Sequence, residues 1–359
     1  MRKTSDNELR VKFMARTSED EDPALFLSLL PDRNAHYDGV EFLFDPDARD
    51  YDFLVVYEDL TFRAGEKKSR RVEPLSCARE NTLLITQEPR SIKVYGPQFL
   101  QQYGYVISRQ PPHVLRHPNQ IFENPPLRWF YGRPLGKGDT RYIDYDSFIS
   151  TPPIRKSRDL STVCSNKQMA ATLHKQRYDF TMALKERLGD GLDLFGRGIR
   201  PINDKAEAMD DFRYHIAIEN YVEPGYWTEK VADCFLAYCV PFYFGADDIG
   251  NIFPEGSFIP IDIFDIDGAE TIIRNEIKSE SYEKRLPALI EARSRVLRDY
   301  NLMTFIARKA KSLYQPITTP SNPDSPHKNV ILGRHAFRAR HPIKASLDIL
   351  HRIRVNHRL

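Results

Sequence analysis

The sequence predicts an α/β fold with a doubly wound parallel sheet. Between about residues 157 and 314, apolar runs of strand length alternate with helix-length segments, which is typical of βαβ units. At 359 residues the chain has room for two domains, at roughly 150 residues per domain. A doubly wound sheet binds its ligand at the carboxyl ends of its strands, so functional residues are expected there.

The first part of the chain mixes short strands with proline-rich loops. Three apolar runs predict strands: Leu9–Ala15, Phe53–Tyr57 and Thr82–Thr86. Residues 110–155 carry repeated prolines and glycines and predict an irregular segment that ends at a domain junction. The predicted first domain is therefore 1–155.

The second part is more regular and predicts a domain over 156–315. A helix is expected at 167–188, another at about 228–239, and further helices from 269 to 314. The turn Gly196-Arg197-Gly198 is expected to border the ligand crevice. The predicted strands are Leu160–Cys164, Leu192–Phe195, Tyr214–Ile218, Pro241–Phe244 and Ser257–Ile261.

Residues 316–359 form a proline-rich linker followed by a basic tail. A predicted helix at about 342–355 places several large aliphatic side chains on one broad side, among seven basic residues and one acid, Asp348, in 331–359. Such a helix either lies on an anionic membrane surface or packs back across the first domain.

Composition narrows the function classes. Lys plus Arg is 52 and Asp plus Glu is 50, so the formal net charge is only +2, which argues against a general nucleic-acid binder. The start of the chain lacks the apolar core of a secretory signal, and the longest strongly apolar run, 234–245, is too short to span a bilayer. We expect a cytoplasmic protein. The basic tail adds the alternative that the protein is peripheral on the cytosolic face of a membrane.

No metal site is expected. The four cysteines form no zinc-type spacing and are expected to be reduced core thiols. Asp-x-Asp strings occur at several places, among them 45–47, 144–146 and 265–267, and we interpret these as chance in a chain with 28% charged residues.

One charged residue lies on the apolar face of a predicted helix. On the helix 167–188, Arg177 falls within the same arc of about 100° as Phe180 and Leu184. An inward arginine must be paired, extend its head group to solvent, or face an anionic ligand. Its position after the first strand of the second domain favours the ligand.

The segment after the strand 214–218 adds two more candidates. Thr228 is in the right place for a helix N-cap, and Glu229 and Lys230 follow in the first turn. Helix N-termini bind phosphate, and a first-turn lysine is unfavourable for the helix dipole unless an anion is near. We interpret the pattern as a nucleotide site, with Lys230 on phosphate and Glu229 on ribose hydroxyls; a solvated lysine beside a dipole-matched acid is the alternative.

The same stretch, FRYHIAIENYVEPGYWTEKVADCFLAYCVPFYFG, resembles the signature of bacterial-type family 10 glycosyltransferases, the α-1,3/4-fucosyltransferases. The downstream PEGSFIPIDIF and the upstream CSNKQMAATLHKQRYDFTMAL with GLDLFGRG are also similar to that family. The resemblance implies a GT-B fold, with two Rossmann-like domains facing across a cleft, and a GDP-sugar donor, usually GDP-fucose. By matching positions, it implies that Arg177 neutralises the diphosphate and that Asn220, Tyr226, Glu229 and Lys230 line the GDP site.

An inverting transfer also needs a carboxylate that removes the acceptor's proton. Family members carry this base after a comparable strand, in a Glu-x-Pro or similar element, and here Gln87-Glu88-Pro89 follows the strand 82–86 with the spacing changed by one. Glu88 is therefore the predicted base. The other candidates are Glu123, Glu58 and Asp59.

The leading hypothesis is an inverting glycosyltransferase that moves fucose or a related sugar from a GDP donor to a hydroxyl of a glycan or glycolipid acceptor, such as lipopolysaccharide. A GT-B enzyme with a different nucleotide-sugar donor is one alternative. A non-catalytic module that binds sugar nucleotides or glycans is the other.

Overall fold

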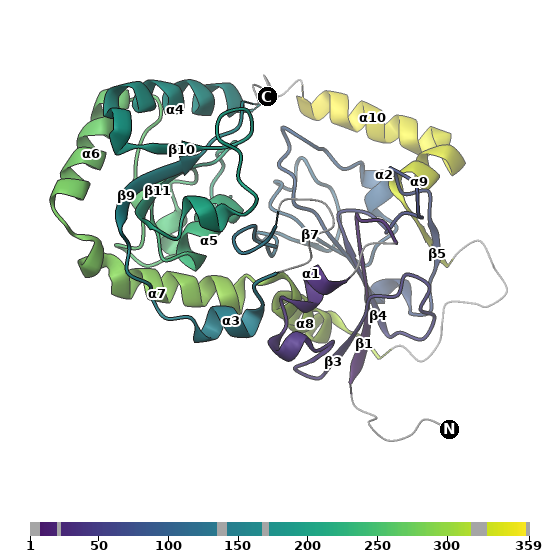
Figure 1. Cartoon of the computed structure of the whole chain (residues 1–359). Coiled ribbons are helices and arrows are strands. Elements are labelled where there is room, and N and C mark those ends of the chain that lie inside the picture. The colour runs from purple at the N-terminus through teal and green to yellow at the C-terminus, as the bar shows by residue number, and fades with distance from the viewer. Residues whose placement is uncertain (1–7, 20–22, 135–141, 167–171, 317–328, 357–359) are drawn as a thin grey trace. The chain divides into compact units, whose positions relative to one another are not determined.

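The computed structural model describes residues 8–19, 23–134, 142–166, 172–316 and 329–356. The chain divides into two compact units (Figure 1). Unit 1 combines Met1–Pro125 with Met303–Leu359, and unit 2 is Pro126–Leu302. Each unit is built on its own parallel sheet with helices, so the predicted α/β fold with two Rossmann-like domains is confirmed.

Unit 1 holds a seven-stranded sheet in the order β2-β3-β1-β4-β6-β7-β8. Its neighbouring strands run parallel, except for the antiparallel pair β2 and β3. The sheet strands are β1 (Leu9–Ala15), β2 (His36–Tyr37), β3 (Val40–Leu43), β4 (Phe53–Tyr57), β6 (Thr82–Ile85), β7 (Tyr105–Ile107) and β8 (Gln120–Ile121).

The C-terminal part of the chain completes unit 1. A separate antiparallel pair joins β5 (Val72–Pro74) to β14 (Val330–Leu332), with Ile331 opposite Glu73. Ile331 and Leu332 pack with Leu84 and Val106 in one hydrophobic cluster, so the core of this unit needs both ends of the chain. The helices of unit 1 are α1 (Ala24–Leu27), α2 (Pro97–Leu100), α8 (Leu302–Leu313), α9 (Arg334–Arg340) and α10 (Pro342–Asn356).

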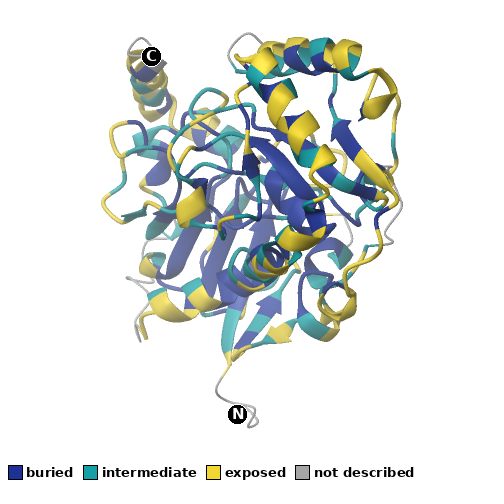
Figure 2. Ribbon diagram, turned by 90° about the vertical axis from the view of Figure 1, so that its left-hand side faces the viewer, coloured by how far each residue is buried: buried dark blue, intermediate teal, exposed yellow. Residues whose placement is uncertain are grey.

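Unit 2 holds a five-stranded parallel sheet in the order β10-β9-β11-β12-β13. Helices α4 and α6 pack together, and so do α5 and α7, so that each face of the sheet has its own pair. Figure 2 shows the buried strands in dark blue and the exposed helix surfaces in yellow. The elements are α3 (Tyr145–Ser150), β9 (Arg158–Val163), α4 (His174–Leu188), β10 (Asp193–Phe195), β11 (Phe212–Ile218), α5 (Glu229–Leu236), β12 (Val240–Phe244), β13 (Ile259–Pro260), α6 (Ile266–Lys278) and α7 (Tyr282–Asp299).

The strongest strand predictions are confirmed. Two buried strands, Leu9–Ala15 and Phe53–Tyr57, have the predicted bounds, and the strand that begins at Thr82 ends one residue early. Helix α4 begins at His174, while residues 167–171 of the predicted helix lie outside the described residues. The four cysteines, which the sequence predicts as reduced core thiols, are free and buried. Within the described part of the chain, no helix is both long and apolar enough to cross a membrane.

The compact units differ from the predicted domains 1–155, 156–315 and 316–359. Residues after Pro125 join unit 2 because they bind its helices and loops: the Phe130 amide donates to Asp233 at 2.9 Å and the Tyr131 hydroxyl to Asp210 at 2.7 Å. The tail joins unit 1 because β14 pairs with β5 and because α10 packs on α2.

A buried ion pair in unit 1 makes a stability prediction. Lys12 of β1 and Glu73 of β5 are both fully buried, with Nζ and Oε1 2.7 Å apart. Glu73→Gln leaves the lysine charge without its counter-ion, which is expected to lower the free energy of unfolding by about 3–5 kcal/mol. Chemical denaturation measures this change.

Two further variants separate lost charge balance from lost packing. The double variant Lys12→Met/Glu73→Leu removes both charges and should be more stable than Glu73→Gln alone. Asp179→Asn breaks the exposed pair with Lys175 and should change stability by less than about 1 kcal/mol. An equal loss from Glu73→Gln and Asp179→Asn would contradict the argument.

Candidate donor site and catalytic carboxylates

The sheet of unit 2 has a topological switch point between β9 and β11. The chain leaves β9 toward β10 on one side of the sheet and continues from β11 toward β12 on the other, and this reversal opens a crevice at the carboxyl ends of the two strands. A pocket of about 170 Å³ lies there. Its lining comprises Thr162, Val163, Cys164, Ser165, Arg177, Thr181, Lys205, Met209, His215, Ile216, Ala217, Ile218, Glu229 and Lys230.

Arg177 reaches this pocket from α4, together with Thr181 one turn later. Phe180 and Leu184 on the same helix are buried, so the arginine lies beside the apolar face as predicted. Its Nε atom is buried and has no hydrogen-bond partner among the described residues. A buried donor without an acceptor is costly, which points to a ligand that supplies one.

The loop from β11 to α5 is held by Glu219. This fully buried carboxylate accepts hydrogen bonds from the Thr228 amide and the Thr228 hydroxyl, each at 2.8 Å. Lys230 Nζ lies 3.2 Å from Glu219 Oε2 and 3.0 Å from the Thr228 hydroxyl. Glu219 therefore fixes the helix N-cap and the pocket lysine together, a positioning role that the sequence analysis did not assign.

In the donor pocket, the opposite charges of Lys230 and Glu229 stabilise each other. Burial would lower the pKa of Lys230, but Glu219 and Glu229 outweigh it and raise that pKa. Burial would likewise raise the pKa of Glu229, but Lys230 and Lys205 lower it to about 2. Both side chains are therefore charged at neutral pH.

Lys205 and His215 are pocket residues that sequence reasoning missed. Lys205 Nζ lies 2.5 Å from the buried Asp233 carboxylate. Burial and the nearby Lys205 lower the pKa of His215 to about 3, so its ring is neutral and shares a 2.8 Å hydrogen bond with Ser161. The one sequence signal that could have indicated this part of the pocket is His215 itself, a histidine inside the otherwise apolar run 214–218.

The glycine turn lies beside the pocket. Gly196 has φ +136°, and a Cβ placed there would lie 1.9 Å from the carbonyl oxygen of the pocket residue Cys164. Only glycine fits this approach, so the turn borders the crevice as the sequence predicted.

Two of the predicted donor residues lie outside the pocket lining. Asn220 follows β11, its carbonyl accepts the Leu173 amide at 2.9 Å, and its buried Oδ1 has no partner among the described residues. The ring of Tyr226 packs edge-on against Tyr221, with centroids 5.4 Å apart. The structure thus brings Arg177, Glu229 and Lys230 into one pocket, and the roles of Asn220 and Tyr226 stay predictions.

The predicted base lies in unit 1, on the loop after β6. Glu88 is half-buried, and its carbonyl accepts a 2.8 Å hydrogen bond from the Gln110 side chain. The strand ends at Ile85, three residues earlier, so Glu88 belongs to the loop and not to the strand end.

Each of the other candidate bases has a partner that explains it. Glu58 accepts from the Gln87 amide at 2.6 Å and from Lys93 at 2.7 Å; burial would raise its pKa, but these partners lower it. Asp59 accepts two backbone amides, while burial raises its pKa. Glu123 pairs with Lys309 at 2.6 Å.

The described residues contain no group of three or more His, Cys, Asp or Glu side chains placed to hold a metal ion.

The family model and the curated relative each match only part of the chain. Residues 154–274 match the family model for glycosyltransferase family 10 (fucosyltransferase) C-term. Over 104 residues the chain is 27% identical to the Alpha-(1,3)-fucosyltransferase FucT of Helicobacter pylori, covering 29% of this chain and 21% of that protein. The chain therefore spans about a fifth of the length of this curated relative.

A crystal structure of an alpha1,3-fucosyltransferase aligns with 90% of this chain and 96% of its own, at 15% identity and a TM-score of 0.48. A crystal structure of alpha1,3-fucosyltransferase with GDP-fucose aligns with 90% and 95%, at the same identity and TM-score. The predicted resemblance to family 10 is confirmed over 154–274, which includes all five predicted donor residues and excludes Glu88.

Proposed function

We propose that this chain is an inverting glycosyltransferase that transfers fucose, or a related sugar, from a GDP-sugar to a hydroxyl of a glycan acceptor. The observation that carries the proposal is the cationic pocket at the switch point of unit 2. It holds Arg177, Lys205 and Lys230, and it lies within the segment that matches family 10. A nucleoside diphosphate is the ligand class for which this charge and position are suited.

Arg177 and Lys230 bind the diphosphate in this proposal. As the sugar leaves, negative charge grows on the diphosphate oxygens, and fixed cations that already face them lower the barrier. The buried Nε of Arg177 is such a donor, and it needs no rearrangement of an existing ion pair. Glu229 accepts hydrogen bonds from the ribose hydroxyls, and Asn220 and Tyr226 line the rest of the GDP site.

Glu88 acts as the general base. It removes the proton of the acceptor hydroxyl while the acceptor oxygen bonds to the anomeric carbon and the bond from that carbon to the diphosphate breaks. The attack comes from the face opposite the leaving group, so a β-linked donor gives an α-linked product.

The acceptor is a glycan or a glycolipid such as lipopolysaccharide, and the protein acts in the cytoplasm with peripheral contact to a membrane. Helix α10 supports this part of the proposal. One side of it packs on α2, while Ile343, Leu347 and Leu350 are half or more exposed. A helix with both aliphatic and basic side chains in solvent is suited to an anionic membrane surface.

Calorimetry tests the donor assignment. GDP and GDP-fucose are expected to bind the purified protein, with an affinity that falls as salt rises, because the contacts are between charges. UDP should bind more weakly. A folded protein that binds neither GDP nor GDP-fucose contradicts the proposal, and tighter binding of UDP or of a UDP-sugar points to the alternative donor.

A further inference from the structure

The two C-terminal helices form a second charged pocket, in unit 1. Helix α10 is anchored by Asp348, whose two carboxylate oxygens accept the Gln98 and Phe99 amides at the start of α2, at 2.8 and 3.1 Å. His351 adds a 2.7 Å hydrogen bond to the Val114 carbonyl. These contacts fix the face of α10 that carries the pocket.

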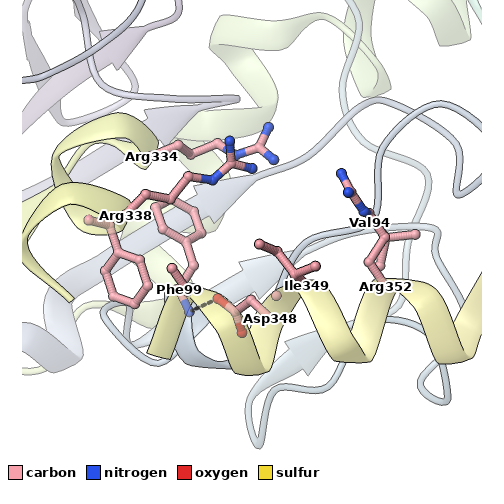
Figure 3. A pocket seen from close by; sticks show the side chains of 10 residues that line it. Val94, Phe99, Arg334, Arg338, Asp348, Ile349 and Arg352 are labelled. Carbon is pink, nitrogen blue, oxygen red and sulfur yellow. Dashed lines mark hydrogen bonds between the residues drawn. The ribbon is translucent and has the colours of Figure 1, made fainter. Parts of the chain in front are cut away.

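The pocket has a volume of about 40 Å³ and lies between α9, α10 and the segment before α2. Figure 3 shows the guanidinium groups of Arg334 and Arg338 side by side, with Arg352 on the far side of Ile349. We call this the arginine pocket. Since about 10–15 Å³ suffices for one water, its volume admits a small tetrahedral anion.

The three arginines form no ion pair with an acid in the described part of the chain. Among the described residues, no ion pair involves the guanidinium of Arg334, Arg338 or Arg352. Asp348 is the one acid in the pocket lining, and both of its oxygens are already used by α2. Burial lowers the pKa of Arg338, and the like charges of Arg334 and Arg352 lower it further. An anion would relieve this repulsion.

The arginine pocket is connected to the loop of the predicted base. The Arg334 amide donates to Asp59 at 3.2 Å, and its guanidinium lies over the Tyr95 ring at 5.2 Å. Lys93 lies over the same ring at 4.3 Å and pairs with Glu58, which accepts the amide of Gln87, the residue before Glu88. A group bound by the arginines is thus connected, through these contacts, to the loop that carries Glu88, the predicted base.

The other flank of α10 carries the same charge. A wider pocket of about 380 Å³, which shares Asp348 with the first, is lined by Arg90, Arg116 and Arg354. This volume is in the range of small-ligand sites, about 300–1,000 Å³. The surroundings of the arginine pocket therefore add positive charge and room for a molecule larger than a single ion.

We propose that the arginine pocket binds a phosphate group carried by the acceptor, so that the acceptor is an anionic saccharide or glycolipid. The acceptor part of this inference rests on the proposed function. The binding of the anion does not, because it follows from three guanidinium groups that surround one cavity and have no acidic partner among the residues that the structure describes.

The test is a titration that does not depend on turnover. With GDP at saturation to occupy the donor pocket, glucose 6-phosphate should bind to the wild-type protein, whereas glucose should not. If GDP does not bind, the same titration is made on Arg177→Ala, in which the donor pocket has lost one of its cations. Failure of the donor assignment and failure of this inference then give different results.

Matched variants locate the binding. Arg338→Ala/Arg352→Ala should weaken glucose 6-phosphate binding by at least about tenfold, since hydrogen bonds between charged groups contribute most. Arg340→Ala/Lys344→Ala removes two positive charges from the same two helices, outside both pocket linings, and should leave the affinity unchanged. All four side chains are exposed, so both proteins should melt as the wild type does.

Equal weakening in the two double variants would overturn the proposal, because diffuse charge would then explain the binding. Binding of glucose as tight as that of its phosphate would also overturn it. Phospholipid vesicles separate the two sources of phosphate. If vesicles rich in phosphatidylglycerol bind, require Arg338 and Arg352, and the sugar phosphate does not bind, then the ligand is a lipid headgroup and the acceptor assignment is overturned.

Discussion

Glu88→Gln is expected to lower kcat for sugar transfer by about 10²–10⁴-fold, the usual contribution of a positioned general base. The amide keeps the size and the hydrogen-bonding capacity of the side chain but cannot take up a proton. GDP affinity should not change, because Glu88 lies in unit 1 and the donor pocket is formed by unit 2. Initial rates with saturating GDP-fucose and acceptor, together with GDP calorimetry, measure the two effects separately.

The acidic limb of the pH profile gives a second readout. A carboxylate base is inactive when protonated, so wild-type kcat/KM should fall at low pH, and in Glu88→Gln this limb should disappear from the residual activity. A merely structural role for Glu88 would lower the rate without changing the shape of the profile.

The neighbouring carboxylates serve as controls. Glu123→Gln breaks the pair with Lys309, whose members are partly exposed, and should leave both rate and stability near the wild-type values. Glu58→Gln removes the buried partner of Lys93 and should lower the melting temperature. Full turnover in Glu88→Gln, or a loss confined to Glu123→Gln, would assign the base elsewhere.

The parts of the fold and of the candidate site that the sequence predicts are those whose pattern lies within a few consecutive residues. The strands Leu9–Ala15 and Phe53–Tyr57 are buried along most or all of their length, so their apolar runs define them. Arg177 was found because a charge within an apolar helical arc conflicts with its surroundings. These are properties of a few consecutive residues.

The missed features depend on long-range contacts. The pairing of β14 with β5 places Val330 opposite Pro74, and neither three-residue strand has a pattern that would indicate the other. Lys205 precedes β11 in the chain, and it lies in the donor pocket because it pairs with Asp233 of α5, the helix that follows β11. The contact between Glu219, which directly follows β11, and Thr228, the N-cap residue of α5, forms across a loop and likewise has no local sequence pattern.

Arg177→Met is expected to weaken GDP binding by about 10-fold or more and to reduce kcat by about 10²–10³-fold. The larger loss in kcat follows from the mechanism, because the charge on the diphosphate grows as the sugar departs. Methionine fills the space of the arginine stem, so the substitution removes charge and hydrogen bonds with little change in packing. Calorimetry with GDP and single-turnover kinetics measure the two losses.

Stability distinguishes this role from a structural one. If Arg177 were part of a structural ion pair, its loss would lower the melting temperature; since its Nε has no partner among the described residues, Arg177→Met should leave the melting temperature unchanged or raise it. Arg177→Lys should recover part of the activity, because the charge remains but the planar set of donors is lost.

Lys175→Ala is the matched control. It lies on the same helix two residues earlier, removes one positive charge, and pairs with Asp179 on the exposed surface, outside the pocket. It should leave GDP binding and kcat unchanged, because an exposed pair is screened by solvent. An equal loss in Lys175→Ala and Arg177→Met would mean that general attraction of the anionic donor accounts for the effect. A loss in Arg177→Met alone, with stability retained, requires a guanidinium that contacts the departing diphosphate.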